Sequence, residues 1–163
     1  MRNIKNKTGF TLIEVMIAVI LVGLAIASLV GANSSFTQAN GAGTELSTAE
    51  FLLEQIKELT AMLPVIDPVS GISNFGPESG EVLATYNDLD DFDGASFSPP
   101  IDASRNTLSN FATFNQQITV ENVNPSNFEQ VENDNSTNFV RITVKVYHNS
   151  KEICSSSWLR ARY

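Results

Sequence analysis

The chain has 163 residues and a formal net charge of −8, a size that suits one domain of ordinary dimensions and a short additional segment. An acidic protein repels the phosphates of nucleic acids, so the charge argues against a nucleic-acid-binding protein. The single cysteine, Cys154, permits no disulfide within one copy of the chain. The composition therefore excludes a small fold held together by internal disulfides.

An almost wholly apolar stretch runs from Phe10 to Val30 and contains one charged residue, Glu14. As a helix rising about 1.5 Å per residue, this stretch is just long enough to cross the hydrocarbon core of a bilayer. A carboxylate inside a bilayer costs about 2.5–3.5 kcal/mol. Glu14 therefore either lies close enough to the helix end to reach the headgroups or has a partner.

The flanking charges predict an orientation for this span. Arg2, Lys5 and Lys7 precede it without any acidic residue, which keeps the N-terminus in the cytoplasm and sends the residues after Val30 outward. A secretory signal peptide begins in a similar way, but its apolar core is shorter and ends at a small-residue cleavage site.

The segment "GFTLIEVMIAV" resembles the type IV prepilin signature, in which a basic leader ends in glycine and a long apolar helix follows. The resemblance implies that a prepilin peptidase cleaves the leader, residues 1–9, between Gly9 and Phe10, and that Phe10 is then N-methylated. It also implies a role for Glu14 in assembly, because its carboxylate would meet the terminal amine of a neighbouring subunit in the filament core.

The same resemblance implies a structural subunit of a type IV pilus or a type II secretion pseudopilus, not an enzyme, with no required cofactor. Its partners would be other pilin or pseudopilin subunits, the prepilin peptidase and the inner-membrane assembly platform. The chain would cross the bacterial inner membrane once before it enters the filament. The absence of proline between Phe10 and Leu63 and of the family's C-terminal disulfide favours a minor subunit. The alternative is an adhesive binding module that uses the anchor for export.

Residues 31–63 predict an amphipathic continuation of the helix beyond the span at 10–30. Gly31, Gly41 and Gly43 each cost about 0.8–1 kcal/mol relative to alanine, so the helix could bend or melt there. Pro64 is expected to end the helix. Between Gly43 and Pro64, apolar residues recur at spacings of three, four and seven and form one stripe, on which Thr60 is the polar member. The apolar residues are Leu46, Ala49, Leu53, Ile56 and Leu63.

Residues 64–163 predict a β-rich domain. Loops dominate up to residue 110, around one expected strand at 81–86. Three clearer strand patterns follow. The first carries Phe114, Ile118 and Val120 on one face, and in the second Val140, Ile142, Val144 and Val146 alternate with polar residues. The third is expected at 153–163, after a turn at 148–151. A long N-terminal helix packed on a C-terminal antiparallel sheet is an α+β fold.

Four carboxylates fall within six residues of the segment "YNDLDDFDG", namely Asp88, Asp90, Asp91 and Asp93. Hard oxygen ligands at this density suggest a calcium site, and a solvated acidic turn is the alternative. The register of an EF-hand loop fails, because Leu89 occupies the first ligand position and no glutamate follows at the last. The string "DDFDG" also resembles a segment of minor pilins of the mannose-sensitive hemagglutinin type.

The one histidine, His148, lies in the expected turn between the last two strands and could approach Cys154 across it. This is the only pairing in the chain that suggests a nucleophile and a base. A turn histidine and a half-buried cysteine are far commoner without catalysis, so we expect no enzyme.

Overall fold

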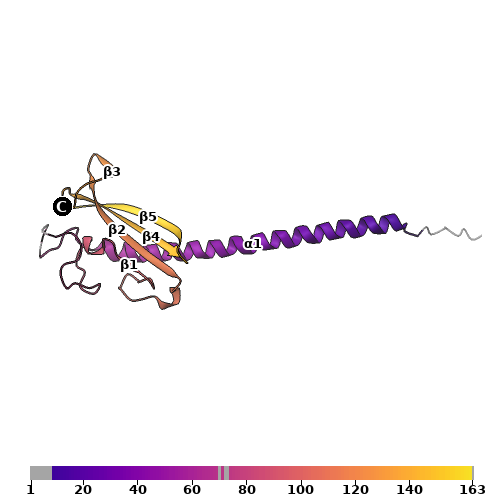
Figure 1. Ribbon diagram of the computed structural model, residues 1–163, viewed down its shortest axis with the longest axis horizontal. Helices are drawn as coiled ribbons and strands as arrows, with labels where there is room; N and C mark the ends of the chain where they lie inside the picture. The colour runs from indigo at the N-terminus through magenta and orange to yellow at the C-terminus, as the bar shows by residue number, and fades with distance from the viewer. Residues whose placement is uncertain (1–8, 70, 72–73, 163) are drawn as a thin grey trace, which may run out of the picture. The chain divides into compact units, whose positions relative to one another are not determined.

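The computed structural model describes residues 9–69, 71 and 74–162, in two units that divide after Gly43. Of the predicted leader, only Gly9 lies among the described residues. The helix α1, Leu12–Ala61, begins in the first unit and ends in the second (Figure 1). Among the described residues it is the one helix long and apolar enough to cross a membrane.

The helix assignment of α1 continues through Gly31, Gly41 and Gly43, so no melted segment is found at these glycines in the described chain. Hydroxyl groups in the same region bond to the carbonyl four residues earlier, as Ser28 does to Leu24 and Ser35 to Gly31. These polar side chains therefore find acceptors within their own helix. The large apolar side chains from Phe10 to Val30 are exposed.

The second unit contains a five-stranded antiparallel sheet, which confirms the predicted α+β fold of a long N-terminal helix and a C-terminal sheet. The main strand order is β1-β2-β4-β5, and β3 pairs with the far end of β2 as a projecting hairpin (Figure 1). The strands are β1 (Ser96–Phe97), β2 (Phe114–Asn124), β3 (Asn127–Val131), β4 (Phe139–His148) and β5 (Lys151–Ala161).

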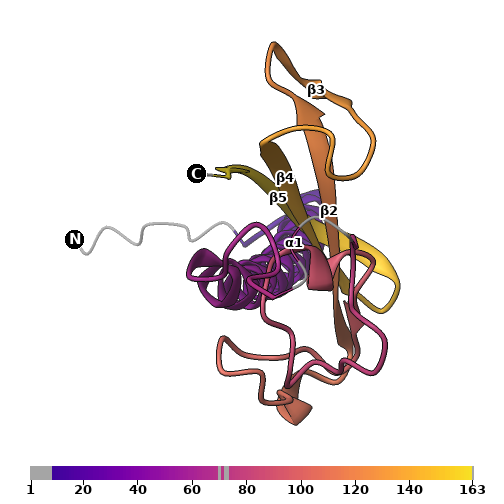
Figure 2. The ribbon, with the colours of Figure 1, turned by 90° about the vertical axis from the view of Figure 1, so that its left-hand side faces the viewer.

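One face of the sheet packs on the final turns of α1 (Figure 2). As predicted, Val140, Ile142, Val144 and Val146 of β4 are buried, whereas the residues between them are not. The helix contributes Ala49, Leu52, Leu53, Ile56 and Thr60 to this interface; Leu52 was not on the predicted stripe, and Leu46 is exposed. The hydroxyl of the buried Thr60 donates to the Ile56 carbonyl, which satisfies it inside the core.

The predicted turn between the last two strands is confirmed. Asn149 and Ser150 both have positive φ, 48° and 67°, as a two-residue hairpin turn that matches the twist of the strands requires. Strand β5 begins at Lys151, two residues earlier than expected, and its register against β4 shifts beside Val146. Both Ile153 and Cys154 consequently pack against the core. Tyr163, the last residue of the predicted strand, lies outside the described residues.

The strand predicted at 81–86 is wrong, because this segment forms a turn. The backbone N–H of Tyr86 donates to the Val82 carbonyl, and the Thr85 hydroxyl caps the same turn through Val82. The Arg105 guanidinium then donates to three carbonyls of the turn, at Leu83, Ala84 and Tyr86. A side chain thus occupies the acceptors that a neighbouring strand would have used.

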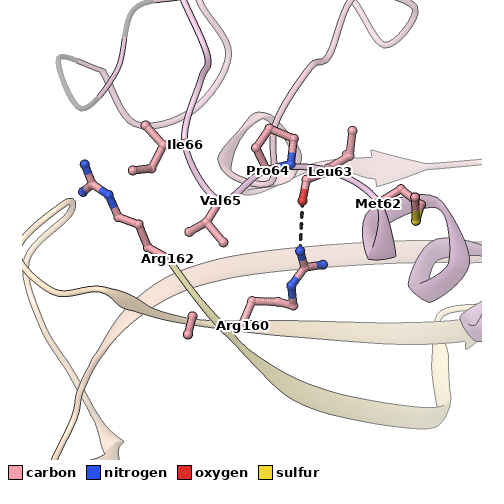
Figure 3. A pocket seen from close by; sticks show the side chains of 8 residues that line it. Met62, Leu63, Pro64, Val65, Ile66, Arg160 and Arg162 are labelled. Atoms are coloured by element: carbon pink, nitrogen blue, oxygen red, sulfur yellow. Dashed lines mark hydrogen bonds between the residues drawn. The ribbon is translucent and has the colours of Figure 1, made fainter.

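The C-terminal end of α1 is closed by a second arginine, Arg160 of β5. Its guanidinium donates to the carbonyls of Thr60, Ala61 and Leu63, at and just after the helix end, where carbonyls have no partner four residues further along a helix. Figure 3 shows the bond from Arg160 to the Leu63 carbonyl, beside a pocket of about 360 Å³ that Arg162 also lines. The helix stops at Ala61, slightly before the expected Leu63, because the residue preceding proline disfavours helical geometry.

We expect Arg160→Ala to lower the free energy of unfolding of the second unit by about 2 kcal/mol, since charged hydrogen bonds contribute about 1.5–3 kcal/mol and this one is partly exposed. The matched control is Arg162→Ala, which removes the same charge from a side chain that does not close the helix and should stay within about 0.5 kcal/mol of the parent. Urea unfolding in detergent, followed by fluorescence of the single tryptophan, Trp158, measures both. Equal losses in the two variants would contradict the capping role.

Candidate functional site

The N-terminal motif begins with a helix cap. Thr11 precedes the first helical residue, and its hydroxyl oxygen accepts the N–H of Glu14 at 3.3 Å. In return, the backbone N–H and the hydroxyl of Thr11 both donate to Glu14 Oε2 at 2.8 Å. This reciprocal arrangement is a capping box, and it supplies partners for two N–H groups that a helix start leaves open.

The capping box answers part of the question that Glu14 poses. Both hydrogen bonds accepted by its carboxylate go to Oε2, and Oε1 accepts none from the part of the chain that the structure describes. Gly9 and Phe10 precede the helix, and the Phe10 side chain is 90 % exposed. The motif thus combines an exposed non-helical peptide bond with a carboxylate that keeps one oxygen available.

We expect Thr11→Ala to speed amide exchange in the first turn of α1 about five-fold, because losing an N-cap costs about 1 kcal/mol. Thr11→Ser keeps the hydroxyl and should exchange like the parent. Hydrogen exchange with mass spectrometry on the detergent-solubilised chain measures the difference. Identical exchange in the alanine variant and the parent would show that the box adds nothing to helix stability.

The four aspartates predicted as calcium ligands lie in and beside the short helix η1 (Asp90–Phe92). Asp88, Asp90 and Asp91 are buried, and each accepts a backbone N–H: Asp88 from Asp91, Asp90 from Gly76, and Asp91 from Asn87. Asp93 is exposed and accepts the N–H of Val120 on β2. The acidic segment is therefore tied into the fold by its own carboxylates and is not a solvated turn.

Burial gives this segment unusual electrostatics. Asp88 is 2 % exposed, and desolvation, followed by the nearby charges of Asp90 and Asp91, raises its pKa to about 8. The pKa of Asp90 is also raised, mainly by desolvation. The concentration of buried negative charge is thus costly.

Sequence reasoning missed two further acidic residues at this place. Glu78 and Glu81 each offer a carboxylate oxygen that lies with one of Asp91 in a group whose members are within 4.8 Å of one another. The loop after α1 brings them there from outside the aspartate-rich string. Their spacing of three residues across a turn was the available signal.

His148 and Cys154 have different surroundings. The His148 ring stacks on Phe114 at a centroid distance of 4.4 Å, and its Nδ1 lies 3.6 Å from Glu45 Oε1. Cys154 pairs with Val146 in the sheet, and desolvation, with Glu50 and Glu152 nearby, raises the pKa of its thiol. A thiol so placed is a poor nucleophile.

Comparison with known proteins identifies the N-terminal segment. Residues 4–30 match the family described as "Prokaryotic N-terminal methylation motif". No curated protein sequence and no solved structure matches the chain. The match spans Gly9, Phe10, Glu14 and the apolar start of α1, and it includes Lys5 and Lys7 of the three basic residues. The chain therefore carries the prepilin-type motif at the head of a long apolar helix, as type IV pilin-like and pseudopilin subunits do.

Proposed function

We propose that the chain is a minor structural subunit of a type IV pilus or a type II secretion pseudopilus. In this proposal a prepilin peptidase cleaves between Gly9 and Phe10, Phe10 is N-methylated, and the subunit assembles through α1. The observation that carries the proposal is the methylation motif at residues 4–30. The exposed peptide bond between Gly9 and Phe10, ahead of the helix, supports cleavage at this position.

The surface of the first unit supports assembly through the helix. Its large apolar side chains from Phe10 to Val30 are half exposed or more in a single copy. A continuous apolar surface of this kind needs lipid or other apolar helices around it. Both requirements are met in turn by a subunit that waits in the membrane and then enters a filament core.

The geometry of Glu14 suggests how one carboxylate serves two purposes. Oε2 closes the capping box with Thr11, and Oε1 remains for a cationic group from outside the chain. After cleavage, the amine of Phe10 on a neighbouring subunit supplies such a group. An ion pair in a low-dielectric filament core would then offset the cost of carrying the charge in an apolar helix.

The test is to shear surface filaments from cells and determine the intact mass and N-terminal sequence of the protein in the filament and membrane fractions. A chain in filaments that begins at Phe10 and is heavier by one methyl group supports the proposal. Its ratio to the main subunit then distinguishes a minor from a major component. A chain that keeps Met1–Gly9 in both fractions would refute processing, and a processed chain found only in the membrane would favour a displayed binding module.

A further inference from the structure

Three carboxylates, from one loop and the short helix η1, converge in the second unit. Glu78 and Glu81 come from the long loop after α1, Asp91 comes from η1, and one oxygen of each lies within 4.8 Å of those of the other two. Oxygens that bind one Ca²⁺ at about 2.3–2.6 Å can be separated by at most about 5 Å. The group therefore has the dimensions of a single calcium coordination sphere.

The backbone holds two of these side chains in position. Glu81 Oε2 accepts the N–H of Glu78, and Asp91 Oδ2 accepts the N–H groups of Asn87 and Asp88. These bonds use one oxygen of each carboxylate and fix the direction of the other. Such positioning lowers the entropic cost of ligation, because the side chains are ordered before any ion binds.

A second observation points to a missing partner. Asp91 is 1 % exposed, and its Oδ1 is buried without a hydrogen-bond donor among the residues that the structure describes. A buried carboxylate oxygen without a donor is expensive, and such groups are normally satisfied by a donor or by a cation. Glu81, Asp88, Asp90 and Asp91 also form no salt bridge within the described chain.

The charges in the group repel one another. The Glu78 N–H lowers the pKa of Glu81, but burial and the carboxylates of Glu78 and Asp91 outweigh it, and the pKa of Glu81 is raised. Asp88 and Asp90 add further negative charge beside Asp91. A divalent cation would convert this repulsion into attraction.

We propose that Glu78, Glu81 and Asp91 bind one calcium ion. All three donors are hard oxygens, and calcium accepts the flexible, incomplete protein coordination that water or carbonyl oxygens complete. The ion would tie the turn at residues 78–86 to η1, whose Phe92 is buried in the core. This ligand set shares only Asp91 with the set predicted from the sequence.

The test uses the full-length chain in non-ionic detergent, freed of metal by a chelator and titrated with CaCl2. We expect one ion per chain by calorimetry and a rise in melting temperature, followed by Trp158 fluorescence, on the order of 10 °C at saturation. Glu81→Gln should bind at least about ten-fold more weakly, because a charged ligand is lost. Without metal this variant should melt no lower than the parent, because repulsion is relieved. Glu58→Gln removes an exposed carboxylate on α1 and should respond to calcium like the parent.

Several results would overturn the proposal. One is an unchanged melting temperature in CaCl2 up to about 10 mM, a concentration well above the dissociation constants of the weakest extracellular calcium sites. A second is a Glu81→Gln variant that responds to calcium as fully as the parent. A third is an equal response to MgCl2, which would replace a calcium site with general screening of the acidic cluster. If acidification alone stabilised the metal-free parent and calcium did not, the carboxylates would hold a proton instead.

Discussion

Replacing Glu14 with alanine is expected to leave the chain inserted and cleaved but to reduce its incorporation into filaments by at least about 100-fold. The reason is the ion pair proposed above between Glu14 and a neighbour's amine. Removing one partner of a buried pair costs about 3–5 kcal/mol, because the other charge is left uncompensated. Quantitative immunoblots of sheared filament and membrane fractions measure the ratio.

The Glu14→Gln variant separates the charge from the helix cap. Glutamine can still accept the Thr11 N–H, since glutamine serves at this position of a capping box. If the charge drives assembly, Glu14→Gln should fail as completely as Glu14→Ala. If the cap alone matters, Glu14→Gln should assemble normally, and the proposed ion pair would be wrong. Glu58→Gln, which removes an exposed carboxylate elsewhere on α1, should enter filaments at the parental level.

The second large effect is expected at Gln116, a fully buried polar residue in β2. Its Oε1 accepts the N–H of Ile101, and its Nε2 donates to the carbonyls of Leu52 and Ile101. One side chain therefore joins the helix, the sheet and the loop before β2. Gln116→Leu keeps the volume but leaves the buried N–H and C=O of Ile101 without these partners.

We expect Gln116→Leu to destabilise the second unit by about 4 kcal/mol, because each unsatisfied buried group costs about 1–3 kcal/mol. This loss would be a large part of the about 5–15 kcal/mol typical of a domain. Gln117→Leu makes the same chemical change one residue along, on the exposed face, and should stay within about 0.5 kcal/mol of the parent. Urea unfolding followed by Trp158 measures both variants, and similar midpoints would contradict the role assigned to Gln116.

The sequence predicts the parts of this fold that depend on a repeating pattern. Strand β4 alternates apolar and polar residues because one face is buried, and the spacing around Ile56 shows the packed side of α1 for the same reason. Strand β3 has no such pattern, since all five of its residues are exposed, and it was missed. The residues at 81–86 have the pattern of a strand, and a strand was wrongly predicted there. Instead, the guanidinium of Arg105, distant in sequence, donates hydrogen bonds to carbonyls of this segment.

The candidate sites were predictable to different degrees. Gly9, Phe10 and Glu14 stand in one short motif, so their local sequence is sufficient to predict their proposed roles. Thr11 and Glu14 also have the spacing of a capping box, a signal that was present but not used. The grouping of Glu78, Glu81 and Asp91 depends on how the loop after α1 folds against η1. Gln116 could not be identified, because a glutamine in a strand does not indicate which buried groups it will meet.

The order in which the packed elements are synthesised has a kinetic consequence. The helix face that begins at Ala49 is made well before β4, whose first residue is Phe139. At about 5–20 residues per second, the ribosome needs several seconds to cover this gap. The β4–β5 hairpin closes through a two-residue turn and can form in about 1–10 μs, so the delay before the core closes is set by translation. During that delay Leu52 and Ile56 are uncovered, and the nascent chain is most vulnerable to aggregation and proteolysis.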